Sequence, residues 1–279
     1  MPGQRRSRPR TRRASPDNTI HSLGEFVDRV TPGVPDPKIR RRRDTGVYRG
    51  SADARAPLLT SLDRLGGVQP PHTKADLEAH VLRNFIRYSR AYNRGHPTND
   101  WEELISAQHH GVPTRLLDWT YSPLVAAFFA TRPYHAGPER DRAIWRLDWQ
   151  IVHRAFELPS LALLVRDLES VLGDGKRASP WEIFARDREA NPFACLVEPP
   201  SLDARIVTQA AVFTISSDKW MSFDDFLEAH DLGRALTKYV IPAECVALLR
   251  DQLDLMGIDE RRLFPDLDGL AASIRRYYE

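Results

Sequence analysis

Apolar side chains recur at helical spacing along several parts of the chain. After Thr73, which can cap a helix, Leu77, Val81, Phe85 and Tyr88 are three or four residues apart, and this spacing predicts a long amphipathic helix. Further helices are predicted from Ser22, where Glu25 completes a capping box, from about Thr98 to Gly111, from Ser122 to Ala130, from Ser222 to His230 and from Glu244 to Met256. The helix from Ser122 is apolar on nearly all faces, so we expect it in the core.

Runs rich in apolar and β-branched residues, bounded by turn residues, predict strands. They occupy 46–50, 143–147, 210–216 and 235–241. The segment 51–71 contains several Pro and Gly residues and is predicted to be mostly loop. Because strands and helices do not alternate regularly, we expect the α+β class: one mixed domain over 19–279, with helices packed on a small, mostly antiparallel sheet.

The positive charge of the chain is concentrated at its N-terminus. Its 279 residues have a formal net charge of +2. Residues 1–44 hold twelve Lys and Arg against five Asp and Glu, a net +7, which leaves −5 for the rest. Residues 1–18 have almost no large apolar side chain, so we expect a disordered basic tail. Such a tail can make weak, salt-sensitive contacts with nucleic acid, or it can simply be a solvated segment without a partner.

Cysteine usage and hydropathy narrow the class of protein further. The two cysteines, Cys195 and Cys245, are fifty residues apart and belong to no CxxC pair, which argues against a disulfide scaffold and a cysteine-rich zinc site. Leu124 to Ala130 is the best apolar run and is far shorter than the ~18 residues of a membrane span. We therefore expect a protein without membrane contact, in the cytoplasm.

A dense group of polar residues lies between the two predicted apolar helices that end at Gly111 and start at Ser122. It consists of Gln108, His109, His110, Thr114, Arg115, Asp118 and Trp119. Burying such groups unpaired costs roughly 1–3 kcal/mol each, so they must satisfy one another or bind a ligand. A self-satisfied network, with Arg115 paired to Asp118, is one interpretation. A metal site fits less well, because His109 and His110 are adjacent and point to different sides of a helix.

These residues carry a resemblance to a known family. The motifs are Tyr48-Arg49-Gly50, Trp101-Glu102-x-Leu104, the run from Ala107 to Thr120, and Ser122 to Ala130. Together they resemble the FRG domain, which is named for a Phe-Arg-Gly triplet and is widespread in bacteria and phages. Here Tyr48 replaces the Phe. The segments from Arg205 to Phe213 and from Leu263 to Leu270 are also similar, although Ala211 stands where the family usually has a glycine.

A weaker similarity to arginine-type mono-ADP-ribosyltransferases suggests how such a site would work. In those enzymes an aromatic-Arg-Gly strand binds NAD and a late Glu polarises the ribose. Tyr48, Arg49 and Gly50 resemble the first element, and Gln209 is placed like the second, although a glutamine cannot supply the charge of a carboxylate. NAD is the cofactor that this similarity implies.

The roles expected for the site follow from this resemblance. The Arg49 guanidinium would donate paired hydrogen bonds to a diphosphate, and Gly50 would let the backbone approach that diphosphate. Tyr48 or Trp119 would stack on a ring, and His109 or His110 would hold a ribose hydroxyl. We expect His109, His110, Asp118 and Gln209 in catalytic positions, and Tyr48, Arg49, Gly50, Gln108, Thr114, Arg115 and Trp119 in ligand-binding positions, without a metal.

Two functions are compatible with this pattern. The first is a pocket for a nucleotide-type ligand, extending to an ADP-ribosyltransferase-like enzyme that uses NAD. The second is a non-catalytic module that binds nucleic acid or protein in phage defence or a toxin system. The two hypotheses differ in one structural requirement, because the first needs Arg49 and the histidines to converge on an open cleft.

Overall fold

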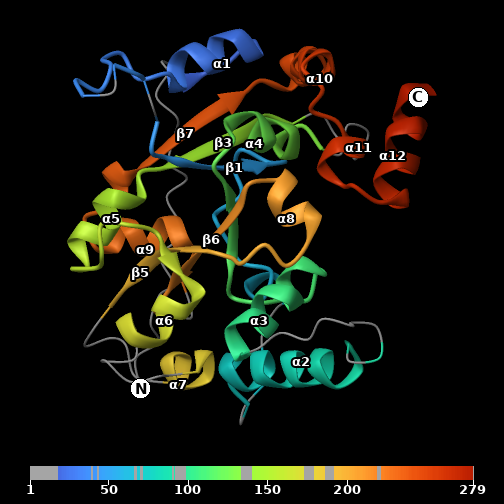
Figure 1. Cartoon of the computed structure of the whole chain (residues 1–279). Coiled ribbons are helices and arrows are strands. Elements are labelled where there is room, and N and C mark those ends of the chain that lie inside the picture. Colours follow the sequence, from blue (N-terminus) through green and yellow to red (C-terminus); the bar gives the residue numbers. More distant parts are fainter. Residues whose placement is uncertain are drawn as a thin grey trace, which may run out of the picture.

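A seven-stranded sheet runs through the middle of the protein, with helices on both of its faces (Figure 1). The strand order is β4-β5-β6-β2-β1-β3-β7. We describe a computed structural model that covers residues 18–38, 40–42, 44–65, 68–69, 72–89, 91, 99–132, 140–172, 179–185, 192–218 and 221–278. The predicted basic tail lies outside these residues except for Asn18, and Thr98, the predicted start of a helix, also lies outside them.

Antiparallel pairing dominates the sheet. Neighbouring strands are antiparallel throughout except for β4 and β5, which are parallel. The strands are β1 (Val47–Ser51), β2 (Leu117–Thr120), β3 (Arg142–Leu147), β4 (Leu163–Leu164), β5 (Ala194–Glu198), β6 (Ala211–Ser216) and β7 (Leu236–Ile241). The expected α+β class with a mostly antiparallel sheet is confirmed.

Capping residues set the start of many helices, as the sequence predicts. Ser22, Ser122 and Ser222 each accept a hydrogen bond from the backbone N–H three residues later. The α-helices are α1 (Leu23–Val30), α2 (Lys74–Ser89), α3 (Asp100–His109), α4 (Pro123–Ala130), α5 (Trp149–Ala155), α6 (Val165–Val171), α7 (Pro180–Ala185), α8 (Ala204–Thr208), α9 (Phe223–Ala229), α10 (Val246–Leu255), α11 (Glu260–Leu263) and α12 (Leu267–Tyr278). Gly111 and Gly257, at φ +81° and +70°, adopt the left-handed conformation that closes α3 and α10.

Two separate groups of helices cover one face of the sheet. Helices α1, α4 and α10 form a core with β1, β3 and β7. Helices α2, α3, α6 and α7 form a second core with β4, β5 and β6. The opposite face has one core, built with α5 and α9. Strands β1 and β2 lie at the centre of the sheet, where the two helix groups meet (Figure 1).

Strand β2 was not predicted from the sequence, and it changes the geometry of the polar run. Its four residues pair with residues 211–214 of β6, and its Thr120 pairs with Tyr48 of β1. Strand β5, an apolar run at Ala194–Glu198, was also not predicted. Among the described residues, no helix is both long and apolar enough to cross a bilayer.

Candidate functional site

An open cleft of about 810 Å³ lies over the centre of the sheet, at the boundary between the two helix groups. It is lined by residues of strands β1, β2 and β6, the C-terminal end of α3, helix α8, the segment before α12 and the first turn of α12. Polar side chains that line it include Arg49, Ser61, Arg64, Gln108, His109, His110, Asp118, Arg205, Gln209, Asp266 and Asp268. The cleft therefore brings together residues that are up to about two hundred positions apart in the chain.

The alternation of strand β2 decides which of its side chains enters the cleft. Successive side chains of a strand point to opposite faces of the sheet. Asp118 points into the cleft, where its side chain is 54% exposed. Leu117 and Trp119 belong to the core on the other face, and the Trp119 indole N–H donates to Thr214 Oγ1 at 2.9 Å. Trp119 touches the cleft but is packed and hydrogen-bonded, so the expected stacking on a ligand ring does not fit its position.

The carboxylate of Asp118 is held by Gln108. The Gln108 amide nitrogen donates to both carboxylate oxygens, each at 2.9 Å. Its amide oxygen accepts from Thr114 Oγ1 at 2.7 Å, which fixes the orientation of the amide. Thr114 is 1% exposed and does not line the cleft. Thr114 was expected to contact a ligand, and in the structure it instead positions Gln108.

Arg49 reaches from β1 to β2 at the floor of the cleft. Its Nη1 donates to the Asp118 carbonyl oxygen at 2.7 Å, and the same nitrogen is 3.7 Å from Asp118 Oδ2. Burial lowers the pKa of the Arg49 guanidinium, Asp118 opposes that shift, and the nearby Arg64 adds to it. Among the described residues the Arg49 guanidinium donates one hydrogen bond, and its side chain, which is 18% exposed, lines the open cleft.

Tyr48 and Gly50 both take part in packing the protein core. The Tyr48 ring packs edge-on against Phe26, and its hydroxyl donates to Asp44, so the ring is a core side chain. A Cβ on Gly50 would lie 2.2 Å from the Ala126 carbonyl oxygen. Gly50 is thus required for the close approach of α4 to β1; it also lines the cleft, and its expected role in access to a diphosphate stays a prediction.

The two histidines line the cleft from the end of α3. His109 is mostly buried, with Nε2 3.4 Å from Asp203 Oδ1, and burial lowers its pKa while Asp203 opposes the shift. The His110 ring packs against that of His109 and lies near Phe85. Across the described ranges, no three His, Cys, Asp or Glu side chains are grouped in a way that could hold a metal ion.

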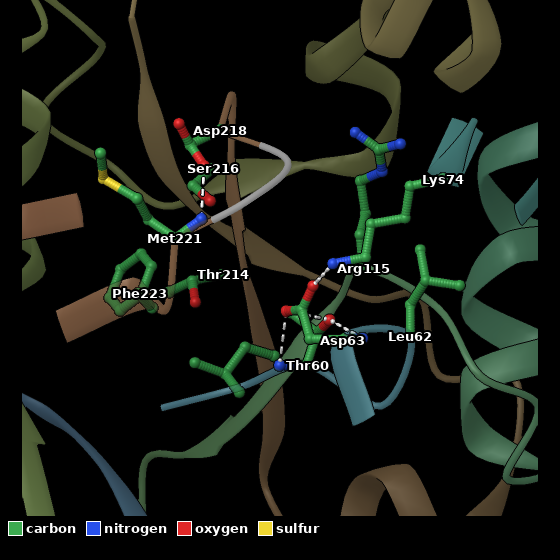
Figure 2. Close-up of a pocket in the computed structure, with 11 residues that line it drawn as sticks. Thr60, Leu62, Asp63, Lys74, Arg115, Thr214, Ser216, Asp218, Met221 and Phe223 are labelled. Atoms are coloured by element: carbon green, nitrogen blue, oxygen red, sulfur yellow. Dashed lines mark hydrogen bonds and ion pairs between the residues drawn. The ribbon is translucent and has the colours of Figure 1, made fainter. Parts of the chain in front are cut away.

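Arg115 lies away from the cleft. Its Nε donates to the Glu78 carboxylate of α2, at 2.7 and 3.0 Å to the two oxygens, and not to Asp118 as the sequence suggested. Figure 2 shows Arg115 beside Lys74 and Asp63, around a separate cavity of about 20 Å³, which is the size of a water site and not of an organic ligand. Arg115 was expected to bind a ligand, but in this geometry its ion pair with Glu78 holds helix α2 in place.

Gln209 is in the cleft, at the C-terminal end of α8. Its side-chain Nε2 donates to the backbone carbonyl oxygen of Leu263 at 2.9 Å, and its backbone carbonyl oxygen accepts from Thr120 Oγ1 at 2.6 Å. Gln209 therefore ties α8 to β2 and α11 while its side chain faces the cleft. The carboxylates among the described residues that line the cleft are all aspartates, namely Asp118, Asp266 and Asp268.

Several lining residues were not singled out as site residues from the sequence. Arg64, Arg205, Asp266 and Asp268 all line the cleft. Arg205 lies over the Phe264 ring at 4.5 Å, and its Nε is buried without a hydrogen-bond partner among the described residues. The sequence held a partial indication of these residues, because Arg205 and the segment from Leu263 to Leu270 belong to the motifs that resemble the FRG domain.

Comparison with protein families identifies the central segment. Residues 44–138 match the family model described as FRG domain. The chain contains an FRG domain. Neither a search of curated proteins nor a search of solved structures returned a match. The matched FRG segment runs from the strand that carries Arg49 to the end of α4, and it includes Gln108, His109, His110 and Asp118.

The FRG segment supplies one half of the cleft, and residues outside it supply the other. Arg205, Gln209, Asp266 and Asp268 follow the matched segment in the chain and line the same cleft. The two halves also differ in character. The FRG half carries Arg49 and the histidines, whereas the later half carries two of the three aspartates. Both halves are needed to build the site.

Proposed function

We propose that the cleft beside the FRG motif binds a phosphate-bearing nucleotide. The observation that carries the proposal is the Arg49 guanidinium: the side chain is 18% exposed, Nη1 lies 3.7 Å from Asp118 Oδ2, and the residue lines an open cleft. A planar guanidinium with unused N–H groups suits the oxygens of a phosphate or diphosphate. Arg64 lies close enough to Arg49 to lower its pKa, and it adds a second cation on the same side.

The size and charge of the cleft support a small ligand. Organic-ligand pockets are usually between about 300 and 1,000 Å³, and this cleft has about 810 Å³. Three arginines and three aspartates line it, so its charges are nearly balanced. A balanced cleft favours a ligand with one or two phosphates over a long polyanion, because nucleic-acid sites gain their affinity from a clear excess of Lys and Arg.

The aspartates and histidines match the other half of a nucleotide. Asp118 is held in place by Gln108 and keeps more than half of its surface free, so it can accept hydrogen bonds from ribose hydroxyls. His109 and His110 offer ring nitrogens at the same edge of the cleft. Stacking by Tyr48 or Trp119 is not part of the proposal, since both rings are packed in cores.

The similarity to ADP-ribosyltransferases extends the proposal to NAD. In that chemistry the bond between nicotinamide and the ribose carbon breaks, nicotinamide leaves, and a nucleophile from the acceptor or from water bonds to the same carbon. A carboxylate stabilises the positive charge that develops on the ribose. Gln209 cannot do this, and Asp118 is the carboxylate at the floor of the cleft that is best placed to do so.

The experiment compares adenosine, ADP and NAD as ligands. Thermal stabilisation of the purified chain by ADP and NAD, and none by adenosine at the same concentration, is the expected result. The catalytic proposal predicts that the wild type releases nicotinamide from NAD. Asp118→Asn should lose this activity, and the control Asp251→Asn on α10 should retain it. Binding without release would limit the proposal to recognition. No stabilisation by any of these compounds, with stabilisation by a single-stranded oligonucleotide, would favour a non-catalytic nucleic-acid module instead.

A further inference from the structure

A loop rich in arginine joins helix α1 to strand β1; its described residues are 31–38, 40–42 and 44–45, and we call them the basic loop. Hydrogen bonds within the loop fix its shape. The Asp36 N–H donates to the Arg41 carbonyl oxygen, and the Arg40 N–H donates to the Asp36 carbonyl oxygen, both at 2.8 Å. The Asp36 carboxylate accepts from the Lys38 N–H, also at 2.8 Å. Figure 1 shows the segment between α1 and β1 at the outer edge of the protein.

The cations of the basic loop are exposed and have no carboxylate partner in the described chain. They are Lys38, Arg40, Arg41 and Arg42. Among the described residues, none of the four forms an ion pair within 4.0 Å. The carboxylate of Asp44, at the end of the loop, pairs instead with Arg146 of β3. Positive charges that are crowded together and left uncompensated attract a polyanion.

The backbone of Arg40 is strained in a way that folding alone does not require. Its φ of +54° lies in the left-handed region, which is unfavourable for a residue with a Cβ and is easily adopted by glycine. Its exposed side chain forms no ion pair with a described residue that would repay this cost. Strained residues of this kind concentrate at functional sites. The arginine at this turn therefore fits a binding role better than a structural one.

The composition of the loop identifies the kind of polyanion. Three of its four described cations are arginines, whose planar guanidinium suits phosphate oxygens. Sites for single-stranded nucleic acid stack bases on aromatic rings, and residues 31–45 contain no Phe, Tyr or Trp. Membrane-surface segments insert Trp, Phe or Leu, and the same residues contain none of these. The phosphates of a duplex remain as the partner that needs only closely spaced cations.

We propose that the basic loop binds the phosphate backbone of a double-stranded nucleic acid, independently of its base sequence. A duplex carries one negative charge per roughly 1.7 Å, and contacts to phosphates position a protein without reading bases. The rest of the chain supports a contact at this place, because residues after 44 have a net charge of −5 and repel a polyanion. The proposal is independent of the nucleotide proposal, since no residue of the basic loop lines the cleft.

The test is fluorescence anisotropy of a short labelled duplex of mixed sequence, titrated with the full chain at several salt concentrations. Each phosphate contact contributes about −0.9 to the slope of log affinity against log salt. The triple variant Lys38→Gln, Arg40→Gln and Arg41→Gln should therefore flatten the slope by about 2–3. Its affinity near 0.1 M salt should fall about a hundredfold or more.

A matched control removes the same charge elsewhere. Arg154, Arg166 and Arg234 are exposed and lie outside the basic loop, so replacing all three by Gln lowers the net charge equally. This control should keep the slope, and its affinity should stay within about threefold of the wild type, because distant charges are screened by salt. Circular dichroism of both triple variants confirms that the fold is retained.

Arg40→Gly separates the binding role from a structural one. It should raise the melting temperature, because the strain is relieved, and weaken duplex binding by about five- to tenfold, because one phosphate contact is lost. A higher melting temperature with unchanged binding would contradict the proposal. The absence of duplex binding would overturn it, and so would equal effects of the two triple variants, which would assign binding to net charge or to residues 1–18. Tighter binding to a single strand or to anionic lipid vesicles would also overturn it.

Discussion

The side-chain amide of Gln108 donates to both carboxylate oxygens of Asp118, each at 2.9 Å. This contact joins the C-terminal end of α3 to strand β2 across the floor of the cleft. It leaves the Asp118 carboxylate oriented but more than half exposed, which is the arrangement that a ligand-binding carboxylate needs.

Reversing this hydrogen bond gives a first prediction. Gln108→Glu should destabilise the protein by about 1–2 kcal/mol near neutral pH, because two carboxylates then face each other and the amide donor is lost. The double variant Gln108→Glu with Asp118→Asn should recover most of the loss, since the new asparagine can donate to the new glutamate. Urea denaturation of the wild type, both single variants and the double variant measures this, and additive losses in the double variant would contradict it.

A second prediction concerns the packing of α4 on β1. In Gly50→Ala the new Cβ would lie 2.2 Å from the Ala126 carbonyl oxygen and 2.3 Å from the Ala130 nitrogen. These are backbone atoms, so helix α4 must move as a unit, and we expect a loss of about 3 kcal/mol. Gly33→Ala is the control, because its Cβ would meet nothing within 4 Å. Equal effects of the two substitutions in chemical denaturation would rule out the packing role of Gly50.

Relief of backbone strain gives a third prediction. Ala210, next to Gln209 in the cleft, has φ +46°, a left-handed conformation that costs a residue with a Cβ roughly 1–2 kcal/mol. Glycine avoids this cost but has more freedom in the unfolded chain, which opposes the gain by about 0.4–1 kcal/mol. Ala210→Gly should therefore raise the free energy of unfolding by about 0.5–1 kcal/mol. A lower melting temperature for the variant would contradict this account.

A fourth prediction concerns stability at acid pH. His153 is buried, its Nε2 accepts from the Leu196 N–H at 2.8 Å, and its Nδ1 lies 2.8 Å from the Pro159 carbonyl oxygen. Nε2 must therefore be unprotonated, and burial lowers the pKa of His153, with Pro159 opposing the shift. The unfolded chain then binds more protons than the folded one just below the ordinary pKa of histidine, about 6.5.

The sign of the effect follows from this difference in bound protons. The stabilisation by neutral His153 is complete above pH ~6.5 and is lost as the pH falls below it, by up to about 1.4 kcal/mol per pH unit. His153→Gln cannot titrate and should show a shallower fall in stability between pH 7 and pH 5. Denaturation curves at several pH values measure the two slopes. His109, whose pKa burial also lowers, contributes in the same direction in both proteins. Equal slopes would contradict the role of His153.

Local patterns were sufficient to predict much of the fold. Helices α1, α4 and α9 begin where serine caps precede helical spacing, and α3 and α10 end at glycines, because capping and closure depend on a few neighbouring residues. Strand β2 was not predicted because its four residues have no period of their own. Its existence depends on pairing with β1 and β6, which are distant in the sequence.

Most of the residues named from the sequence line the cleft, but their arrangement was not predicted. Missing β2 meant that Asp118, Trp119 and Arg115 were expected in one pocket, whereas strand alternation sends Trp119 to the other face and Arg115 pairs with Glu78 of α2. Sequence spacing could not reveal that pairing, because Glu78 lies 37 residues earlier. Arg49, His109, His110, Asp118 and Gln209 all line one open cleft, and nucleotide binding there stays a proposal.

The most direct test of the central claim is calorimetric titration of ADP and of adenosine into the wild type and two variants. Arg49→Gln removes the guanidinium that faces the cleft, and Arg166→Gln removes one that is 81% exposed outside it. We predict that ADP binds at least about tenfold more tightly than adenosine to the wild type and to Arg166→Gln, and that Arg49→Gln loses this preference. Equal affinity of the wild type for ADP and adenosine, or a full preference for ADP in a folded Arg49→Gln protein, would contradict the account.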